Sequence, residues 1–119
     1  MISDERFRKR DHLLKTKDFS RLYKKGRSCK NDYLVMYHLA NDLAHSRIGF
    51  SISSRKVRLA TDRNRVRRIL REVFRKHKND LKTGYDIVIV VVRNPAPQPD
   101  YSSVEQRFLK LARTAAVSL

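Results

Sequence analysis

The chain has 119 residues and a formal charge of +16, with 28 Lys and Arg against 12 Asp and Glu. This length suits a single domain over residues 1–119, and a hydrophobic share of 40% excludes a wholly disordered basic tail. The longest aliphatic run covers only residues 87–92, which is too short to span a membrane. The charge excess therefore predicts a polyanionic partner, with nucleic acid favoured over an anionic membrane surface.

Cysteine usage indicates the cellular compartment. Cys29 is the only cysteine, which excludes an internal disulfide and a Cys-based zinc site. The N-terminus also lacks the apolar core of a secretory signal. Both observations predict a cytoplasmic protein, because the cytoplasm keeps thiols reduced.

The first predicted element is a short helix that is capped by Thr16 or Asp18 and ends at Gly26 as a C′ glycine. Residues at i, i+3 and i+4 spacing give it one apolar face. That face consists of Phe19, Leu22 and Tyr23.

Two strands are predicted next, over residues 32–40 and 47–53, because side chains of different character alternate along both segments. The intervening residues 41–46 are expected to form a hairpin loop. A short extra strand is predicted near residues 55–58.

From Asp62 the apolar period changes to 3.6 residues, which predicts a helix capped by Thr61 or Asp62 and fading near Lys78. The continuously β-branched residues 87–92 are typical of a strand that is buried on both faces. Regular structure is then interrupted by Pro95, Pro97 and Pro99.

A final helix is predicted from the capping-box pattern of Ser102 and Glu105 and from the apolar stripe that follows it. The element order is α-β-β-(β)-α-β-α, with the extra strand in parentheses. An α/β two-layer sandwich follows, in which three helices pack on a small sheet of four strands.

The helix from Asp62 carries a band of guanidinium groups opposite its apolar stripe, with one amide near its N-terminus. A solvated charged face is the ordinary alternative, but such faces normally mix both signs of charge. Guanidinium groups also suit bidentate phosphate contacts, which favours nucleic-acid binding. The predicted contact residues are Arg63, Asn64, Arg65, Arg67, Arg68 and Arg71.

Asn64 allows two interpretations. It can accept a hydrogen bond from a water ligand of hydrated Mg²⁺ shared with phosphates, or it is an ordinary polar residue of the first helical turn. The pattern leaves both open, and no metal site formed by the protein alone is expected.

Three aromatic residues, Phe19, Tyr23 and Tyr37, fall on a helix and on a strand that follows it. A sheet face with aromatics and few charges can stack unpaired bases, at about 1–3 kcal/mol per base. Spacing alone favours a core role for all three. The phenol groups of Tyr23 and Tyr37 favour a partly open cleft.

No catalytic pattern is present: the four histidines are scattered, and there is no HExxH motif, zinc spacing or Gly-rich phosphate loop. If the chain serves a reaction, another component must supply the chemistry. The alternative is a structural RNA-binding protein, such as a ribosomal component. A membrane-surface protein is disfavoured because the helix from Asp62 needs its apolar stripe for the core.

Five short motifs follow one another along the chain: Lys17-Asp18-Phe19, Tyr23-Lys24-Lys25-Gly26-Arg27, Ile48-Gly49-Phe50-Ser51-Ile52-Ser53, Arg63-Asn64-Arg65-Val66-Arg67-Arg68 and Tyr85-Asp86-Ile87-Val88. In this order they resemble the bacterial ribonuclease P protein component, over roughly residues 6–115. An Arg-Asn-Arg tripeptide alone is a weak signal, whereas the ordered set is specific.

The resemblance implies a four-stranded sheet with a left-handed β-α-β crossover through the arginine helix, against the usual right-handed rule. It also implies a ribonucleoprotein subunit that binds a catalytic RNA and the 5′ leader of precursor tRNA. The RNA and its Mg²⁺ ions remove the leader by endonucleolytic hydrolysis, and no cofactor bound tightly to the protein is expected.

By position, the resemblance assigns the arginine helix to the catalytic RNA, and Phe19, Tyr23 and Tyr37 to the leader cleft, while Leu22 stays in the core. Ser54-Arg55 stands where many members carry two lysines. This departure leaves open whether Arg55, Lys56 and Arg58 make further RNA contacts. Leader preference, self-association and the order of residues 1–12 without RNA are also open.

Overall fold

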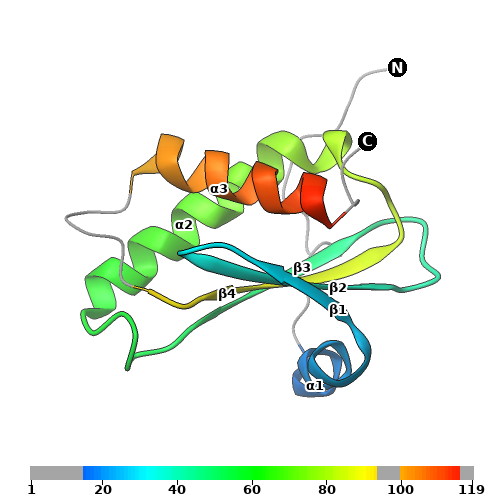
Figure 1. Ribbon diagram of the computed structural model, residues 1–119, viewed down its shortest axis with the longest axis horizontal. Coiled ribbons are helices and arrows are strands. Elements are labelled where there is room, and N and C mark those ends of the chain that lie inside the picture. The colour runs from blue at the N-terminus through cyan, green and yellow to red at the C-terminus, as the bar shows by residue number, and fades with distance from the viewer. Residues whose placement is uncertain (1–14, 94–99, 116–119) are drawn as a thin grey trace.

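The computed structural model describes residues 15–93 and 100–115 (Figure 1). The three prolines 95, 97 and 99 and the N-terminal residues 1–12 therefore lie outside the described residues. In chain order the elements are α1 (Thr16–Lys25), β1 (Arg27–Lys30), β2 (Leu34–Ala40), β3 (Arg47–Ile52), α2 (Ala60–His77), the 3₁₀ turn η2 (Lys78–Asp80), β4 (Tyr85–Val91) and α3 (Tyr101–Thr114).

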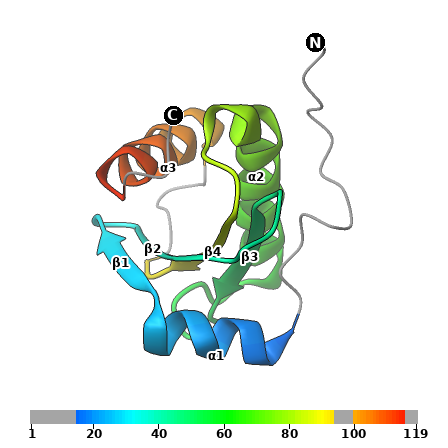
Figure 2. The same ribbon diagram turned by 90° about the vertical axis from the view of Figure 1, so that its right-hand side faces the viewer.

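The four strands form one mixed sheet in the order β1-β2-β4-β3. β2 pairs antiparallel with both β1 and β4, whereas β3 pairs parallel with β4. The parallel pair is joined through α2. Viewed along these two strands in Figure 2, the chain passes from β3 over the sheet through α2 and down to β4 on its left, which is a left-handed crossover. The expected α/β fold, with three helices packed on a four-stranded sheet, and its unusual crossover are confirmed.

The helices divide between the two faces of the sheet: α2 and α3 cover one, and α1 lies on the other (Figure 2). The main core fills the space under α2 and α3, where Leu70, Phe74 and Phe108 are fully or almost fully buried. A smaller cluster under α1 is centred on Leu22 and Val88. β4 contributes to both clusters, which explains its continuous β-branched sequence.

The fourth strand is β1, immediately after α1, and not the segment near residues 55–58 that the sequence predicts. That segment is a turn: the Lys56 and Val57 amides donate to the Ser53 carbonyl at 3.2 and 2.9 Å. Val57 is completely buried, so its apolar side chain anchors the turn instead of forming part of a strand. β1 is an edge strand with mostly exposed side chains, so it shows no apolar alternation.

The predicted helix caps are wrong. None of the three helices has a side-chain cap hydrogen bond, and their N-caps are Lys15, Leu59 and Asp100. Instead of closing a capping box, the Glu105 carboxylate lies 2.8 Å from His77 Nε2 and so joins α3 to the end of α2. Glu105 thus contacts a residue of another helix instead of the start of its own helix.

Gly26 does end α1, but in an extended conformation with φ −74°, not as a left-handed C′ glycine. A Cβ at this position would lie 2.6 Å from the Leu22 carbonyl oxygen and 3.1 Å from the His38 carbonyl oxygen. Glycine is therefore required because a side chain would meet the end of its own helix first and β2 next, and not because of backbone dihedral freedom.

Candidate nucleic-acid interface

The predicted cationic band is found on α2, and we call it the arginine surface. The helix turns its apolar stripe, including Val66 and Val73, into the core, so the polar residues face outward. Within residues 15–93 and 100–115, the side chains of Arg67, Arg68 and Arg71 form no hydrogen bond or ion pair. The arginine surface consists of Arg63, Asn64, Arg65, Arg67, Arg68 and Arg71.

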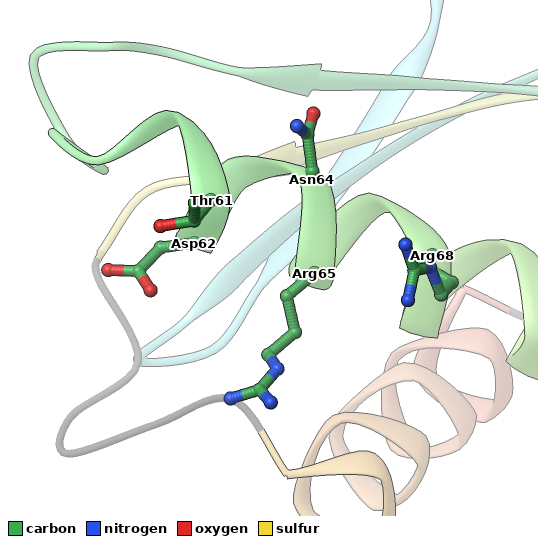
Figure 3. Close-up of a pocket in the computed structure, with 5 residues that line it drawn as sticks. All are labelled: Thr61, Asp62, Asn64, Arg65 and Arg68. Atoms are coloured by element: carbon green, nitrogen blue, oxygen red, sulfur yellow. The ribbon is translucent and has the colours of Figure 1, made fainter.

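A hollow of about 500 Å³ lies at the N-terminal end of this surface, lined by Thr61, Asp62, Asn64, Arg65 and Arg68 (Figure 3). The amide of Asn64 and the guanidinium of Arg65 leave α2 in opposite directions. The first turn of a helix adds a partial positive charge and free N–H groups. With a single carboxylate beside two guanidinium groups, the hollow suits a phosphate group better than a metal ion held by protein alone.

Arg63 is directed differently from the rest of the arginine surface. Its Nη1 donates to the carbonyl oxygens of Val57 and Arg58, at 2.8 Å in both cases. These bonds attach the turn before α2 to the helix itself. The exposed cations Arg55, Lys56 and Arg58 are therefore held beside the start of α2.

The structure brings the three predicted aromatics together on the α1 side of the sheet, and we call them the aromatic patch. The Tyr23 and Tyr37 rings meet edge to face with centroids 5.0 Å apart, and Phe19 lies 6.5 Å from Tyr23. Tyr23 is 44% exposed, whereas Phe19 and Tyr37 are half-buried against Leu22 and its neighbours. The patch is thus an open aromatic edge on a small core, and Leu22 is the core residue that the sequence predicts.

A buried carboxylate holds α1 against the sheet, and sequence reasoning missed it. Asp86 on β4 is fully buried and accepts hydrogen bonds from Arg47, from Asn41 and from Arg21 of α1. Burial raises the pKa of Asp86, but the bonds from Arg47 and Asn41 and the nearby guanidinium charges outweigh it and hold the pKa below its ordinary value. The sequence signal that could have indicated this role is a carboxylate directly before a run of β-branched residues that is typical of a buried strand.

Metal-ligating side chains do not gather in the described part of the chain: no group of three His, Cys, Asp or Glu is placed to hold a metal ion. None of its helices is long and apolar enough to cross a membrane. The arginine surface and the aromatic patch are the two sets of sequence-predicted site residues that the structure assembles.

Comparison with known proteins gives the same family at the level of sequence and of structure. The family model described as Ribonuclease P matches residues 7–116. The chain is 40% identical over 108 residues to the ribonuclease P protein component of Pelotomaculum thermopropionicum, covering 91% of this chain and 95% of that protein. It is 36% identical over 114 residues to the ribonuclease P protein component of Clostridioides difficile, covering 95% of this chain and 98% of that protein.

Solved structures agree with these relatives. A Staphylococcus aureus RNase P protein mutant with defective mRNA degradation activity superposes with a TM-score of 0.83 and 31% identity, covering 92% of this chain and 91% of that one. The Thermotoga maritima RNase P protein, in complex with 1-(4-fluorophenyl)-2-thiourea, superposes with a TM-score of 0.79 and 32% identity, covering 86% of this chain and 97% of that one. This chain belongs to the ribonuclease P protein component family, the protein subunits of a ribonucleoprotein endonuclease that matures tRNA 5′ ends with RNA as its catalytic part.

Proposed function

We propose that this protein binds the catalytic RNA of ribonuclease P through the arginine surface and the 5′ leader of precursor tRNA on the aromatic patch. The observation that carries the proposal is that the cationic residues and the exposed aromatic residues lie on opposite sides of the sheet. The guanidinium groups of Arg67, Arg68 and Arg71 have no partner among the described residues and suit a phosphate backbone. The exposed Tyr23 ring beside Tyr37 suits an unstacked base.

In this arrangement the protein positions RNA and leaves the phosphodiester chemistry to the RNA subunit. Mg²⁺ is the cofactor of that RNA and supplies Lewis-acid activation of the reacting groups. Asn64 is exposed beside Arg65 and Arg68, so its amide can accept a hydrogen bond from a water molecule of an RNA-bound ion. The complex works in the cytoplasm.

Reconstitution tests this function. The protein is combined with the ribonuclease P RNA of a relative, and cleavage of precursor tRNA is followed across a Mg²⁺ titration. We expect no cleavage by protein alone, and cleavage by the complex at lower Mg²⁺ than the RNA requires by itself. Cleavage by metal-loaded protein without RNA would contradict the proposal, and so would an unchanged Mg²⁺ requirement.

A comparison of precursor tRNA with mature tRNA distinguishes the proposed function from that of a purely structural RNA-binding protein. A leader-binding protein increases the affinity of the complex for precursor tRNA over mature tRNA, whereas a structural subunit affects both equally. The ratio of the two affinities, measured with and without protein, decides between them.

A further inference from the structure

A second hollow lies apart from both surfaces described above. It has a volume of about 310 Å³, and neither the arginine surface nor the aromatic patch contributes to it. Figure 1 places the start of β1, the end of β2 and the approach to β4 at one end of the sheet, and the first turn of α2 at the other. We call this hollow the edge pocket; its lining includes Lys25, Arg27, His38, Lys82, Tyr85 and Ala115.

Three cations converge on the edge pocket, two from the junction of α1 and β1 and one from the loop before β4. Lys25 ends α1, Arg27 begins β1, and Lys82 lies in the loop before β4. Their side chains are exposed and form no hydrogen bond or ion pair with any residue in the described ranges. Among the residues that the structure describes, no carboxylate lines the pocket. Like charges gathered without a counter-charge repel one another, and a bound anion relieves that repulsion.

The wall between these cations is aromatic and weakly polar. The His38 and Tyr85 rings lie 6.2 Å apart. Burial and the charge of Arg27 lower the pKa of His38, so its imidazole is neutral at pH 7 and offers one N–H donor without adding to the repulsion. At about 30 Å³ per water molecule, the volume corresponds to roughly ten waters, so a phosphate can enter together with part of its sugar.

We propose that the edge pocket binds a phosphodiester group of an RNA strand. This gives the protein a second RNA contact, at the end of the sheet away from the start of α2. The molecule extends 39 Å along its longest axis, so the two contacts engage phosphates that are well separated. The inference rests on the RNA partner of this family and is independent of the leader assignment.

Salt dependence of binding to the catalytic RNA tests the proposal. Lys25→Gln, Arg27→Gln and Lys82→Gln are compared with Lys30→Gln, which removes one charge from the far end of β1. Each lost phosphate contact reduces the slope of log K against log salt by about 0.7–0.9. We expect that loss in at least two pocket variants and not in Lys30→Gln. Lys25→Arg and Lys82→Arg should retain the wild-type slope.

Equal slopes in the wild type and all three pocket variants overturn the proposal, as does a loss of slope in Lys30→Gln as large as theirs. All four positions are exposed, so circular dichroism and the urea midpoint should remain at their wild-type values. Arg68→Gln is measured in parallel, so failure of the edge pocket is distinguished from failure of the arginine surface.

Inorganic phosphate distinguishes an RNA site from a site for a free anion. The isolated protein is titrated with phosphate while the NMR signals of the His38 and Tyr85 rings are followed. We expect weak saturable shifts that are lost in Lys82→Gln, together with the change of slope for RNA. Shifts with phosphate but no change of slope for RNA mean that the pocket takes only free anions, and they overturn the proposal.

Discussion

Arg47 on β3 donates from Nε and Nη2 to the two carboxylate oxygens of Asp86 on β4, at 2.8 and 2.6 Å. Asp86 is fully buried, whereas the Arg47 side chain keeps 24% of its surface exposed. Arg21 of α1 reaches the same carboxylate. One buried charge thus joins the parallel strand pair to the helix that carries Phe19 and Tyr23.

Asp86→Asn should lower the free energy of unfolding by about 2–4 kcal/mol, because it removes charge-assisted hydrogen bonds inside the fold. Urea unfolding measures this loss. Asp42→Asn is the matched control, since Asp42 is exposed and Asn tolerates its positive φ of 60° equally well. A similar loss in both variants would mean that the buried network contributes nothing specific.

The same network predicts a pH dependence of stability. The pKa of Asp86 is lowered on folding, so its contribution is complete above the pKa of an unfolded Asp, about 3.9, and is lost as pH falls through the lower folded pKa. The difference in unfolding free energy between wild type and Asp86→Asn should be constant from pH 7 to 5 and shrink below about pH 4. A difference that already shrinks between pH 7 and 5 contradicts the assignment.

Arg68→Gln and Arg71→Gln should weaken binding to the catalytic RNA. Each should reduce its salt slope by about 0.9 if the lost contact is to a duplex phosphate. Both side chains lie on the exposed face of α2, so stability should change by less than about 0.5 kcal/mol. Filter binding across a salt series gives the slopes. Wild-type slopes in both variants would remove these residues from the RNA interface.

Arg63→Gln should behave differently. The Arg63 guanidinium donates to two carbonyl oxygens of the turn before α2, so its loss should destabilise the fold by about 1–3 kcal/mol. Urea unfolding of Arg63→Gln beside Arg68→Gln separates the two roles. Equal and negligible losses of stability would show that Arg63 does not hold the turn.

Tyr23→Ala should weaken binding of precursor tRNA to the reconstituted complex, by about 1–3 kcal/mol for one stacked base. Tyr23 is 44% exposed, so the fold should tolerate its loss. Tyr23→Phe retains the ring and should bind as the wild type does. Mature tRNA, which lacks the leader, should bind all three proteins equally, and an equal loss for both tRNAs would assign Tyr23 to general packing.

The spacing of apolar residues in the sequence was sufficient to predict α2, β3 and the buried part of β4, because each of these elements buries one continuous set of apolar side chains. The family signature was also local, since it lies on one helix and on short flanking motifs. β1 escaped prediction because its four residues are mostly exposed and it is held by backbone bonds to β2. Edge strands of this kind leave no apolar pattern in the sequence.

The tertiary structure decided what each polar or aromatic residue does. Arginines of one helix look alike in sequence, yet Arg63 is turned to backbone carbonyls while Arg68 is left open to solvent. Glu105 matched a local capping pattern, but it lies beside His77, which is 28 residues away. The sequence by itself determined the charge, the amphipathic helices and the family, because these depend on neighbours in the chain. Partners, exposure and the edge pocket depend on residues that only the folded chain brings together.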